Sequence, residues 1–253
     1  MLLLDLTLPT PAENLALDEA LLERAEQSDG PYEVLRLWEA PAPFVVVGAS
    51  SRVEQEVQED ACRRRNVPIL RRASGGAAVL AGPGCLMYAV VLSFQLRPEL
   101  RAIDRAHAFV LETLLAGLRP LAPLACREGT SDLALDGRKF SGNSLRINRE
   151  HLLYHGTLLY DFDLALVGEL LGKPPRQPQY RAGRDHGSFV RNLPVERDAL
   201  RAAVIRAWQA NTLDADWPAA ATARLATEKY AVREWTHRHR GPGRHCDERV
   251  SDL

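Results

Sequence analysis

The chain has 253 residues, 46% of them hydrophobic and 26% charged, so it can bury a large core without disulfides or a structural metal. Its net charge of -1 argues against nucleic acid as a partner and favours a small molecule or a protein. The four cysteines form no Cys-x-x-Cys pair, and neither a signal peptide nor a membrane-spanning run is apparent. We therefore expect a cytoplasmic protein with no membrane partner and no tightly bound metal.

The first half of the chain alternates between predicted helices and strands. Apolar side chains recur at helical spacing in residues 12–27, with Glu and Arg on the opposite side, which predicts an amphipathic helix. The shorter apolar runs between Gly, Pro and polar residues are typical of strands. Strands are expected at 32–38, 44–47, 69–72 and 86–94, the first two joined by a turn containing Pro, and further helices at 53–65 and 102–118.

The second half begins with strands and ends with helices. Asp136 and Gly137 form a typical hairpin turn pair between two of the strands. Strands are expected at 133–135, 139–144 and 152–160, and helices at 164–171, 196–211 and 219–230. This order predicts an α+β fold with a mixed, largely antiparallel sheet and flanking helices. Residues 238–253 are charged and rich in Gly, so we expect a flexible tail.

A glycine-rich loop follows the predicted strand at 69–72. Arg71 and Arg72 precede Ser74, Gly75 and Gly76. Adjacent glycines permit positive φ and close approach of a ligand, so that successive N–H groups can converge on phosphate or carboxylate oxygens, while arginines add charge-assisted contacts. On this pattern alone, an ordinary turn after a strand is the simpler interpretation.

Two further side chains are chemically suggestive. Lys139 follows the hairpin turn and is flanked by Ser and Gly, so its ammonium group can stabilise negative charge on a carboxylate or phosphate. The alternative is an edge-strand lysine that repels pairing with another chain. His155 lies in an apolar strand, where a hydrogen-bonded core histidine is the default interpretation.

Together these segments resemble the catalytic domain of lipoate–protein ligases, in the superfamily that includes biotin ligases and octanoyltransferases. The resemblance runs from Leu15 to Trp235, and its motifs occur in the expected order. They are NLALDEALL, LRLW, PFVVVG, RRASGGAAV, SDLALDGRKFSG and HGTLLYDFDL. The fold implied by the resemblance agrees with the mixed sheet and flanking helices predicted above.

The resemblance implies an enzyme that activates lipoate or octanoate with ATP and Mg²⁺ to an acyl-adenylate and transfers the acyl group to a lysine of a lipoyl-domain or glycine-cleavage H-like protein. Lys139 would contact the acyl carbonyl and α-phosphate. Asp132 would lie near the reactive centre and either hold Mg²⁺ or orient the acceptor lysine. The residues that would line the acyl and phosphate pocket or flank the nucleotide are Arg72, Ser74, Gly75, Gly76, Ala77, Gly142, Ser144 and His155.

The acyl chain would need an apolar tunnel, which would shield the reactive anhydride from water and contribute about 0.8 kcal/mol per buried methylene. Residues that could form it are Leu80, Leu86, Tyr88 and Val90. The same residues are equally compatible with a role in the core of a strand.

The chain departs from the ligase pattern in the loop. The family has a third glycine, a histidine, an aspartate and an asparagine where this sequence has Ala77, Ala81, Gly82 and Cys85. The chain also leaves no room for a C-terminal accessory domain, so we expect one catalytic domain over residues 1–237 that works alone or with a separate partner subunit.

These departures favour two alternatives. The first is an octanoyltransferase that takes octanoate from acyl carrier protein through a nucleophilic cysteine, for which Cys126 and Cys85 are the candidates. Each of these thiols can equally be a small buried hydrophobic group. The second alternative is a non-catalytic protein that binds lipoate or a lipoyl domain, although such a protein has no need for the cation of Lys139.

Overall fold

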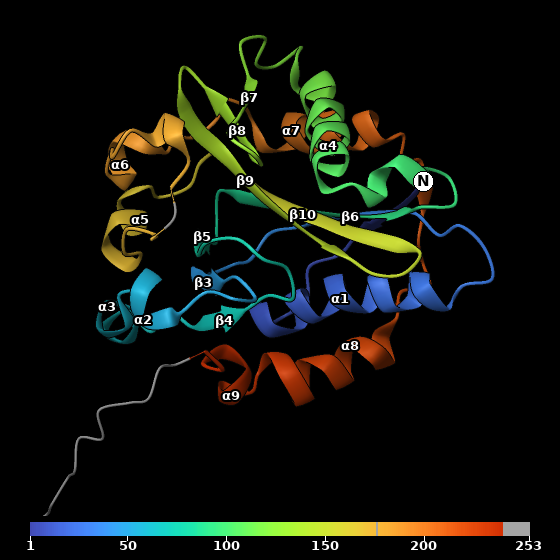
Figure 1. Cartoon of the computed structure of the whole chain (residues 1–253), viewed down its shortest axis with the longest axis horizontal. Coiled ribbons are helices and arrows are strands. Elements are labelled where there is room, and N and C mark those ends of the chain that lie inside the picture. The colour runs from blue at the N-terminus through green and yellow to red at the C-terminus, as the bar shows by residue number, and fades with distance from the viewer. Residues whose placement is uncertain (176, 240–253) are drawn as a thin grey trace, which may run out of the picture.

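The structure is a computed structural model that describes residues 1–175 and 177–239 (Figure 1). Its main sheet comprises β1 (Leu2–Asp5), β2 (Val34–Trp38), β6 (Cys85–Ser93), β7 (Cys126–Glu128), β8 (Asp132–Leu135), β9 (Arg138–Ile147), β10 (His151–Leu159) and β11 (Thr212–Leu213). The strand order is β11-β1-β2-β6-β10-β9-β8-β7. β1 pairs in parallel with β2 and β11, and the other neighbours are antiparallel. The α+β fold with a mixed, largely antiparallel sheet is confirmed.

A smaller sheet faces the main one and has the order β4-β3-β5. Its strands are β3 (Phe44–Val47), β4 (Ile69–Arg71) and β5 (Val79–Ala81). β3 is buried along its whole length, because it packs in a hydrophobic cluster shared with the facing side of the main sheet. The glycine-rich loop joins β4 to β5 of the smaller sheet. Ser144 of β9 binds the Gly75 carbonyl, so the loop faces the main sheet.

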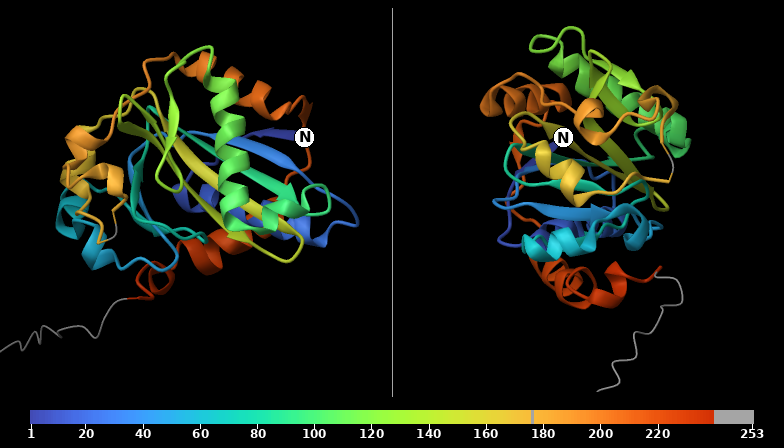
Figure 2. Two further views of the ribbon diagram at one scale, coloured as in Figure 1. Left: turned by 45° about the horizontal axis from the view of Figure 1, so that its top comes forward. Right: turned by 90° about the vertical axis from the view of Figure 1, so that its left-hand side faces the viewer.

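Helices lie on both faces of the main sheet, and others lie beside the smaller sheet (Figures 1 and 2). They are α1 (Pro11–Gln27), α2 (Val53–Glu56), α3 (Glu59–Arg64), α4 (Ile103–Leu118), α5 (Ala165–Leu170), α6 (His186–Phe189), α7 (Arg197–Trp208), α8 (Ala219–Leu225) and α9 (Arg233–Thr236), with 3-10 turns at η1 (Pro98–Arg101) and η2 (Gln179–Arg181) and a π-helical turn at η3 (Ala226–Tyr230). α1 packs on one face, and α4 and α7 pack together on the other.

α1 starts at a capping box, in which Thr10 accepts a hydrogen bond from the backbone of Glu13 and the Glu13 carboxylate accepts one from the backbone of Thr10. Its apolar face is buried as predicted. Asp18 and Glu19 are buried as well, although the helical pattern predicts that acidic side chains face water. Each of them is satisfied by a basic partner, Arg36 for Asp18 and Lys229 for Glu19.

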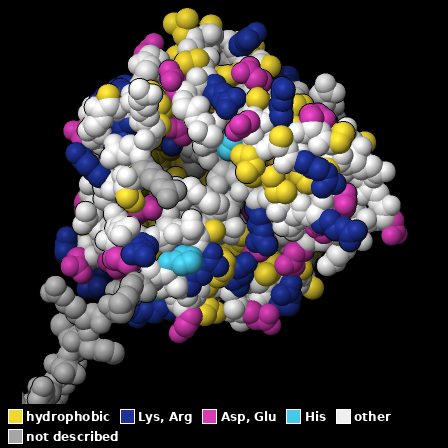
Figure 3. Space-filling view, viewed as in Figure 1, with side chains coloured by type: hydrophobic (Ala, Val, Ile, Leu, Met, Phe, Trp, Pro, Cys, Tyr) yellow, Lys and Arg dark blue, Asp and Glu magenta, His cyan; other side chains and the backbone are white. Residues whose placement is uncertain are grey.

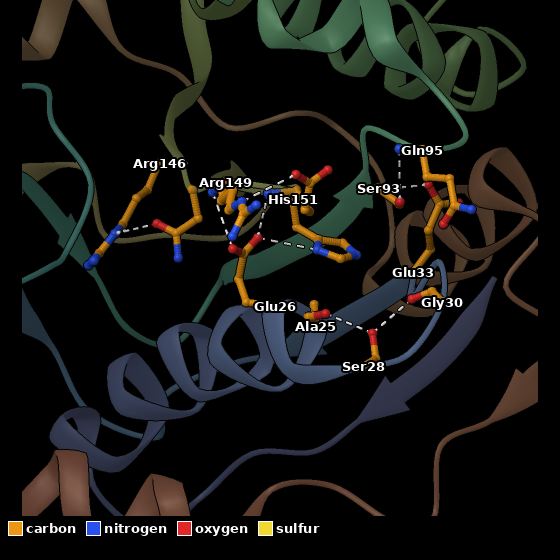
Figure 4. A network of polar contacts seen from close by, with 12 residues as sticks. Ala25, Glu26, Ser28, Gly30, Glu33, Ser93, Gln95, Arg146, Arg149 and His151 are labelled. Carbon is orange, nitrogen blue, oxygen red and sulfur yellow. Dashed lines mark hydrogen bonds and ion pairs between the residues drawn. The ribbon is translucent and has the colours of Figure 1, made fainter.

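The C-terminal end of α1 also holds the turn between β9 and β10. The Glu26 carboxylate accepts hydrogen bonds from the backbone N–H groups of Arg149, at 3.2 Å, and Glu150, at 2.9 Å (Figure 4). It also lies 3.3 Å from Nδ1 of His151, the first residue of β10. One carboxylate thus fixes the hairpin whose far end carries the candidate site.

Several predicted elements differ from the observed ones. The strands expected at 32–38 and 44–47 are not paired with each other, because β2 belongs to the main sheet and β3 to the smaller one. The helix expected at 53–65 is divided into α2 and α3 at Val57, which forms a bridge with Leu171. β1, β5, β7 and β11 are short, two to four residues each, and were not predicted.

The first two residues of the predicted flexible tail contact the folded part of the chain. Arg238 and His239 both contact the backbone carbonyl of Ala49, and the guanidinium of Arg238 lies over the ring of Trp235. The remainder of the tail, 240–253, lies outside the described residues. Within the described part of the chain, no helix has the length and apolar character needed to cross a membrane.

Candidate active site

A cavity of about 370 Å³ lies between the glycine loop and the strands β9 and β10. The molecular surface is hollowed left of centre in the view of Figure 3. The lining of the cavity includes most of the residues that the resemblance selects, although they are far apart in the sequence. The predicted residues that line it are Arg72, Gly76, Ala77, Asp132, Lys139, Gly142, Ser144 and His155.

Two further compartments adjoin this cavity. One, of about 130 Å³, shares Asp132 and Lys139 with it and extends under α5 and α6, where its wall is mostly apolar. The other, of about 380 Å³, shares Gly76 and Ala77 with the first and is lined by polar side chains of residues 50–56. Lys139 and the glycine loop therefore lie where compartments of different character meet.

The position of Lys139 is set by the turn that precedes it. Asp136 and Gly137 adopt φ angles of 51° and 66°, the positive values that a tight hairpin requires, and β9 then pairs with β8. This brings the Lys139 ammonium 2.7 Å from an oxygen of Asp132. The strand has a neighbour on each side at this point, because Lys139 also forms a bridge with Val190. The edge-strand interpretation of Lys139 is therefore wrong.

Asp132 is held from two sides. Lys139 contacts one carboxylate oxygen, and the hydroxyl of Tyr180 donates to the other at 2.8 Å. Burial, together with the charge of Asp132, raises the pKa of Tyr180 well above its ordinary value, so this hydroxyl stays protonated and remains a donor. The arrangement keeps the lysine ammonium at the junction of the compartments.

The two arginines of the loop have internal roles. Arg72 donates to the carbonyls of Val46, at 3.2 Å, and Ala77, at 3.0 Å, and its Nε lies 3.1 Å from the hydroxyl oxygen of Ser74. Burial lowers its pKa to about 10, which leaves it charged at neutral pH. Arg71 points to the opposite side of β4 and binds backbone carbonyls near the C-terminus, so the expectation that it contacts a ligand anion is wrong.

The loop conformation depends on glycine at one position in particular. Gly76 has a φ of 88°, and a Cβ there would lie 2.9 Å from the guanidinium of Arg72. The hydroxyl of Ser144 donates to the carbonyl of Gly75 at 2.8 Å, which joins the loop to β9. Ser74 itself is buried and lies 2.5 Å from Nε2 of His155, so it supports the loop from behind.

Gly142 provides a test of the position of the lysine. A Cβ at Gly142 would lie 2.8 Å from both Cε and Nζ of Lys139. The variant Gly142→Ala is therefore expected to displace the ammonium and to lower kcat/KM by about ten- to a hundred-fold, because misplacement by about 1 Å has that effect in oriented sites. Gly168→Ala, where a Cβ meets nothing within 4 Å, is the matched control in a steady-state assay. An unchanged kcat/KM in Gly142→Ala would show that the position of Lys139 does not matter.

The predicted tunnel is only partly correct. In β6 alternate side chains face opposite sides of the sheet, and Leu86, Tyr88 and Val90 pack against α4 and α7, away from the cavity. Met87 faces the cavity, and Leu80 lines the apolar compartment. The sequence showed the strand only as a continuous apolar run, so the choice of face required the tertiary structure.

The departures from the ligase loop pattern mostly lie away from the cavities. Ala81, Gly82 and Cys85 line none of the three compartments, and Ala77 alone does. Ala81 and Cys85 are fully buried, and Gly82 packs against the backbone of Pro43. The changed residues therefore leave the described lining largely unaltered.

Neither candidate nucleophile lies at the cavity. Cys85 is fully buried in the core, and burial raises its pKa to about 12. Cys126 is exposed on β7, the edge strand of the main sheet, and partial burial together with Glu128 raises its pKa. A thiolate nucleophile needs a lowered pKa and access to the substrate, and neither described thiol has both.

Sequence reasoning missed three polar residues of the site. Asn143 lines the cavity and accepts a hydrogen bond from Tyr88 at 2.6 Å. Tyr180 and Arg181 come from the Pro- and Arg-rich connection after α5, which the sequence shows only as a loop. Asn143, between Gly142 and Ser144, could have been found from its position on the lysine strand.

Comparisons with known proteins place the chain in a family. The model described as "Lipoyl protein ligase A/B catalytic domain" matches residues 10–210, and the chain belongs to this family of lipoate ligases and octanoyltransferases. A protein of Aeropyrum pernix provisionally named lipoate-protein ligase A is 31% identical over 205 residues, which cover 81% of this chain and 73% of that protein. Octanoyltransferase LipM of Carboxydothermus hydrogenoformans is 27% identical over 257 residues, which cover 90% of this chain and 94% of that protein.

Solved structures share the fold. A bi-partite lipoate protein ligase from Thermoplasma acidophilum, described with its E2 lipoyl domain, has a TM-score of 0.78 at 24% identity and covers 93% of this chain and 95% of that chain. A lipoate-protein ligase A bound with ATP has a TM-score of 0.78 at 23% identity, covering 93% of this chain and 98% of that chain.

Proposed function

We propose that this protein is an ATP-dependent lipoate–protein ligase, which forms an acyl-adenylate from lipoate or octanoate and transfers the acyl group to a lysine of a lipoyl-domain protein. Residues 1–237 would form its catalytic unit. The ligase relative from Aeropyrum pernix and the ATP-bound neighbour support the chemistry, and the neighbour described with an E2 lipoyl domain supports the acceptor. The arrangement of cations around the apolar compartment carries the proposal.

Two cations border this otherwise mostly apolar compartment. Lys139 lines it on one side, and Arg181, which is 3% exposed, lines it as well. Nη2 of Arg181 is buried without a hydrogen-bond partner among the described residues. A buried N–H donor without an acceptor is costly, so the free Nη2 of Arg181 suits an α-phosphate in this compartment, with the adenosine beyond it. The adjoining cavity, which is lined by Leu15, Val46 and Met87, suits the acyl chain.

The proposed reaction has two steps. A carboxylate oxygen of lipoate attacks the α-phosphorus of ATP, the bond to the β-phosphate breaks, and pyrophosphate leaves. Lys139 would stabilise the negative charge that develops between the two substrates, and the N–H groups of the glycine loop would add to it. In the second step the acceptor amine, after losing its proton, attacks the acyl carbon, the bond to the phosphate oxygen breaks, and AMP leaves.

Mg²⁺ would accompany the nucleotide. The cation commonly binds through one or two carboxylates and the phosphates of the substrate. Asp132 is the carboxylate at the junction, but both of its oxygens are already engaged by Lys139 and Tyr180. Among the described residues no group of three or more metal-binding side chains is present. Asp132 would therefore have to release one of these contacts to bind the Mg²⁺ that ATP brings.

Under the octanoyltransferase alternative one cysteine thiol would be essential for activity, whereas the ligase proposal predicts that neither Cys126 nor Cys85 is. Because the described cysteines do not line the cavities, Cys126→Ser at the exposed thiol and Cys85→Ala at the buried one are expected to retain activity within about two- to three-fold when compared per folded protein. A steady-state assay with each variant measures this. Loss of activity in Cys126→Ser alone, with the fold intact, would support the thiol mechanism.

The proposal is tested by following the mass of an apo lipoyl domain. One mixture holds ATP, Mg²⁺ and lipoate, and the other holds octanoyl acyl carrier protein without ATP. We expect a lipoyl mass gain only in the first mixture. Modification only in the second mixture would establish the octanoyltransferase instead. If neither mixture modifies the domain, calorimetric binding of lipoate would favour a binding protein or a missing partner subunit.

A further inference from the structure

Four buried polar side chains form a continuous chain behind the glycine loop. Arg36 of β2 lies 2.6 Å from one carboxylate oxygen of Asp18 in α1. The other oxygen of Asp18 lies 3.1 Å from Nδ1 of His155 in β10, and Nε2 of His155 lies 2.5 Å from the hydroxyl oxygen of Ser74. All four residues are at most 8% exposed, so water does not compete for these contacts.

For a neutral imidazole, the partners fix the direction of each hydrogen bond. Arg36 can only donate, and the carboxylate of Asp18, in its ion pair with Arg36, can only accept, so Nδ1 of His155 carries the proton. Nε2 of the neutral ring then offers a lone pair, and the hydroxyl of Ser74 donates to it. The Ser74 oxygen in turn accepts from Nε of Arg72 at 3.1 Å. In this arrangement each contact has one donor and one acceptor.

The order of Ser74, His155 and Asp18 is that of a hydrolase triad, but the position of the hydroxyl excludes a nucleophile. Ser74 is 1% exposed and does not line the cavity, whereas His155 does. A nucleophilic serine must reach the substrate. These hydrogen-bonded residues therefore hold the loop that begins at Ser74, and Ser74 does not react with the substrate.

We propose that Asp18, His155 and Ser74 are positioning residues that hold Gly75 and Gly76 in the conformation that receives the activated acyl group. The proposal rests on the proposed function. The loop is also tied by Arg72, by Ser144 of β9 and by Ser51, all of which bind its carbonyls, and Ser74 is the contact that links it to β10 and, through His155, to α1. Without that link the N–H groups of the loop lose a fixed direction.

The tautomer of His155 is the first test and does not depend on activity. In long-range ¹H–¹⁵N spectra of the uniformly labelled protein, each imidazole reports which nitrogen carries its proton, and His155→Gln identifies the signal. We expect His155 as the Nδ1–H tautomer, with Nε2 as an acceptor. The Nε2–H tautomer would overturn the proposal whether or not the protein is a ligase.

The second test compares two buried serines. Ser74→Ala is expected to lower kcat for ATP-dependent lipoylation by about ten- to a hundred-fold, with KM for lipoate within about three-fold, since the loop is misplaced while the acyl cavity stays intact. Ser93→Ala, which removes a hydroxyl that is also 1% exposed but lies outside the three compartments, is the matched control.

Equal kcat in both variants would overturn the proposal, and so would a fall in kcat that merely follows a lost folded fraction in thermal unfolding. His155→Gln, which loses the contact to Asp18, is expected to lower kcat as Ser74→Ala does. If the wild-type protein shows no ATP-dependent activity, the proposed function fails, and the tautomer measurement still decides whether the hydrogen bonds run as inferred.

Discussion

Lys139→Ala is expected to reduce kcat/KM for ATP-dependent lipoylation by about 10²–10³-fold, the effect of removing one preorganised group that stabilises developing charge. The ammonium lies at the junction of two compartments and is 2.7 Å from Asp132. Its removal would leave the developing charge without this cation. The folded state should be largely unaffected, because Asp132 keeps its hydrogen bond from Tyr180.

Steady-state kinetics with an apo lipoyl domain measure the effect, and pyrophosphate release with lipoate alone isolates the first step. Lys173→Ala, at an exposed lysine outside the three compartments, is the matched control. Lys139→Arg should recover only part of the activity, because a planar guanidinium cannot take the position of a compact ammonium. Activity of Lys139→Ala within a few-fold of the wild type would contradict the role given to this lysine.

The sequence predicted the fold well where the pattern was long. α1 and α4 are long helices and β6 and β10 are long apolar runs, and all four were found close to their observed bounds. The elements that were missed, such as β5 and β11, have two or three residues, too few for a period to appear. Assignment of β2 and β3 to different sheets depends on long-range pairing, which a local pattern does not contain.

The candidate site was predictable where several motifs occur in the order of a known family. Lys139 after its Asp-Gly turn and Gly76 of the glycine loop are examples, and both line one cavity. Burial, in contrast, could not be read from residue types alone. Asp18 looks like a solvated helix residue in the sequence, yet it lies 2.6 Å from Arg36 in the core.

Arg71 illustrates the same difficulty, because its neighbour Arg72 faces the cavity while Arg71 does not. Its guanidinium donates to the carbonyls of Thr236, at 2.9 Å, and Ser51, at 2.8 Å, and also to Gly48. The indole of Trp235 donates back to the Arg71 carbonyl at 2.8 Å. Burial lowers the pKa of Arg71 to about 10, so it is still charged at neutral pH and can serve all of these acceptors.

Arg71→Met is therefore expected to destabilise the protein by at least about 3 kcal/mol, because three buried carbonyls lose their donor at about 1–3 kcal/mol each. Urea unfolding followed by circular dichroism gives the free energy, and tryptophan fluorescence reports the release of Trp235. Arg105→Met, at an exposed arginine of α4, should change stability by less than about 0.5 kcal/mol. If Arg71→Met were as stable as this control, β4 and the C-terminal segment would be held together by packing alone, and the hydrogen bonds of Arg71 would contribute little.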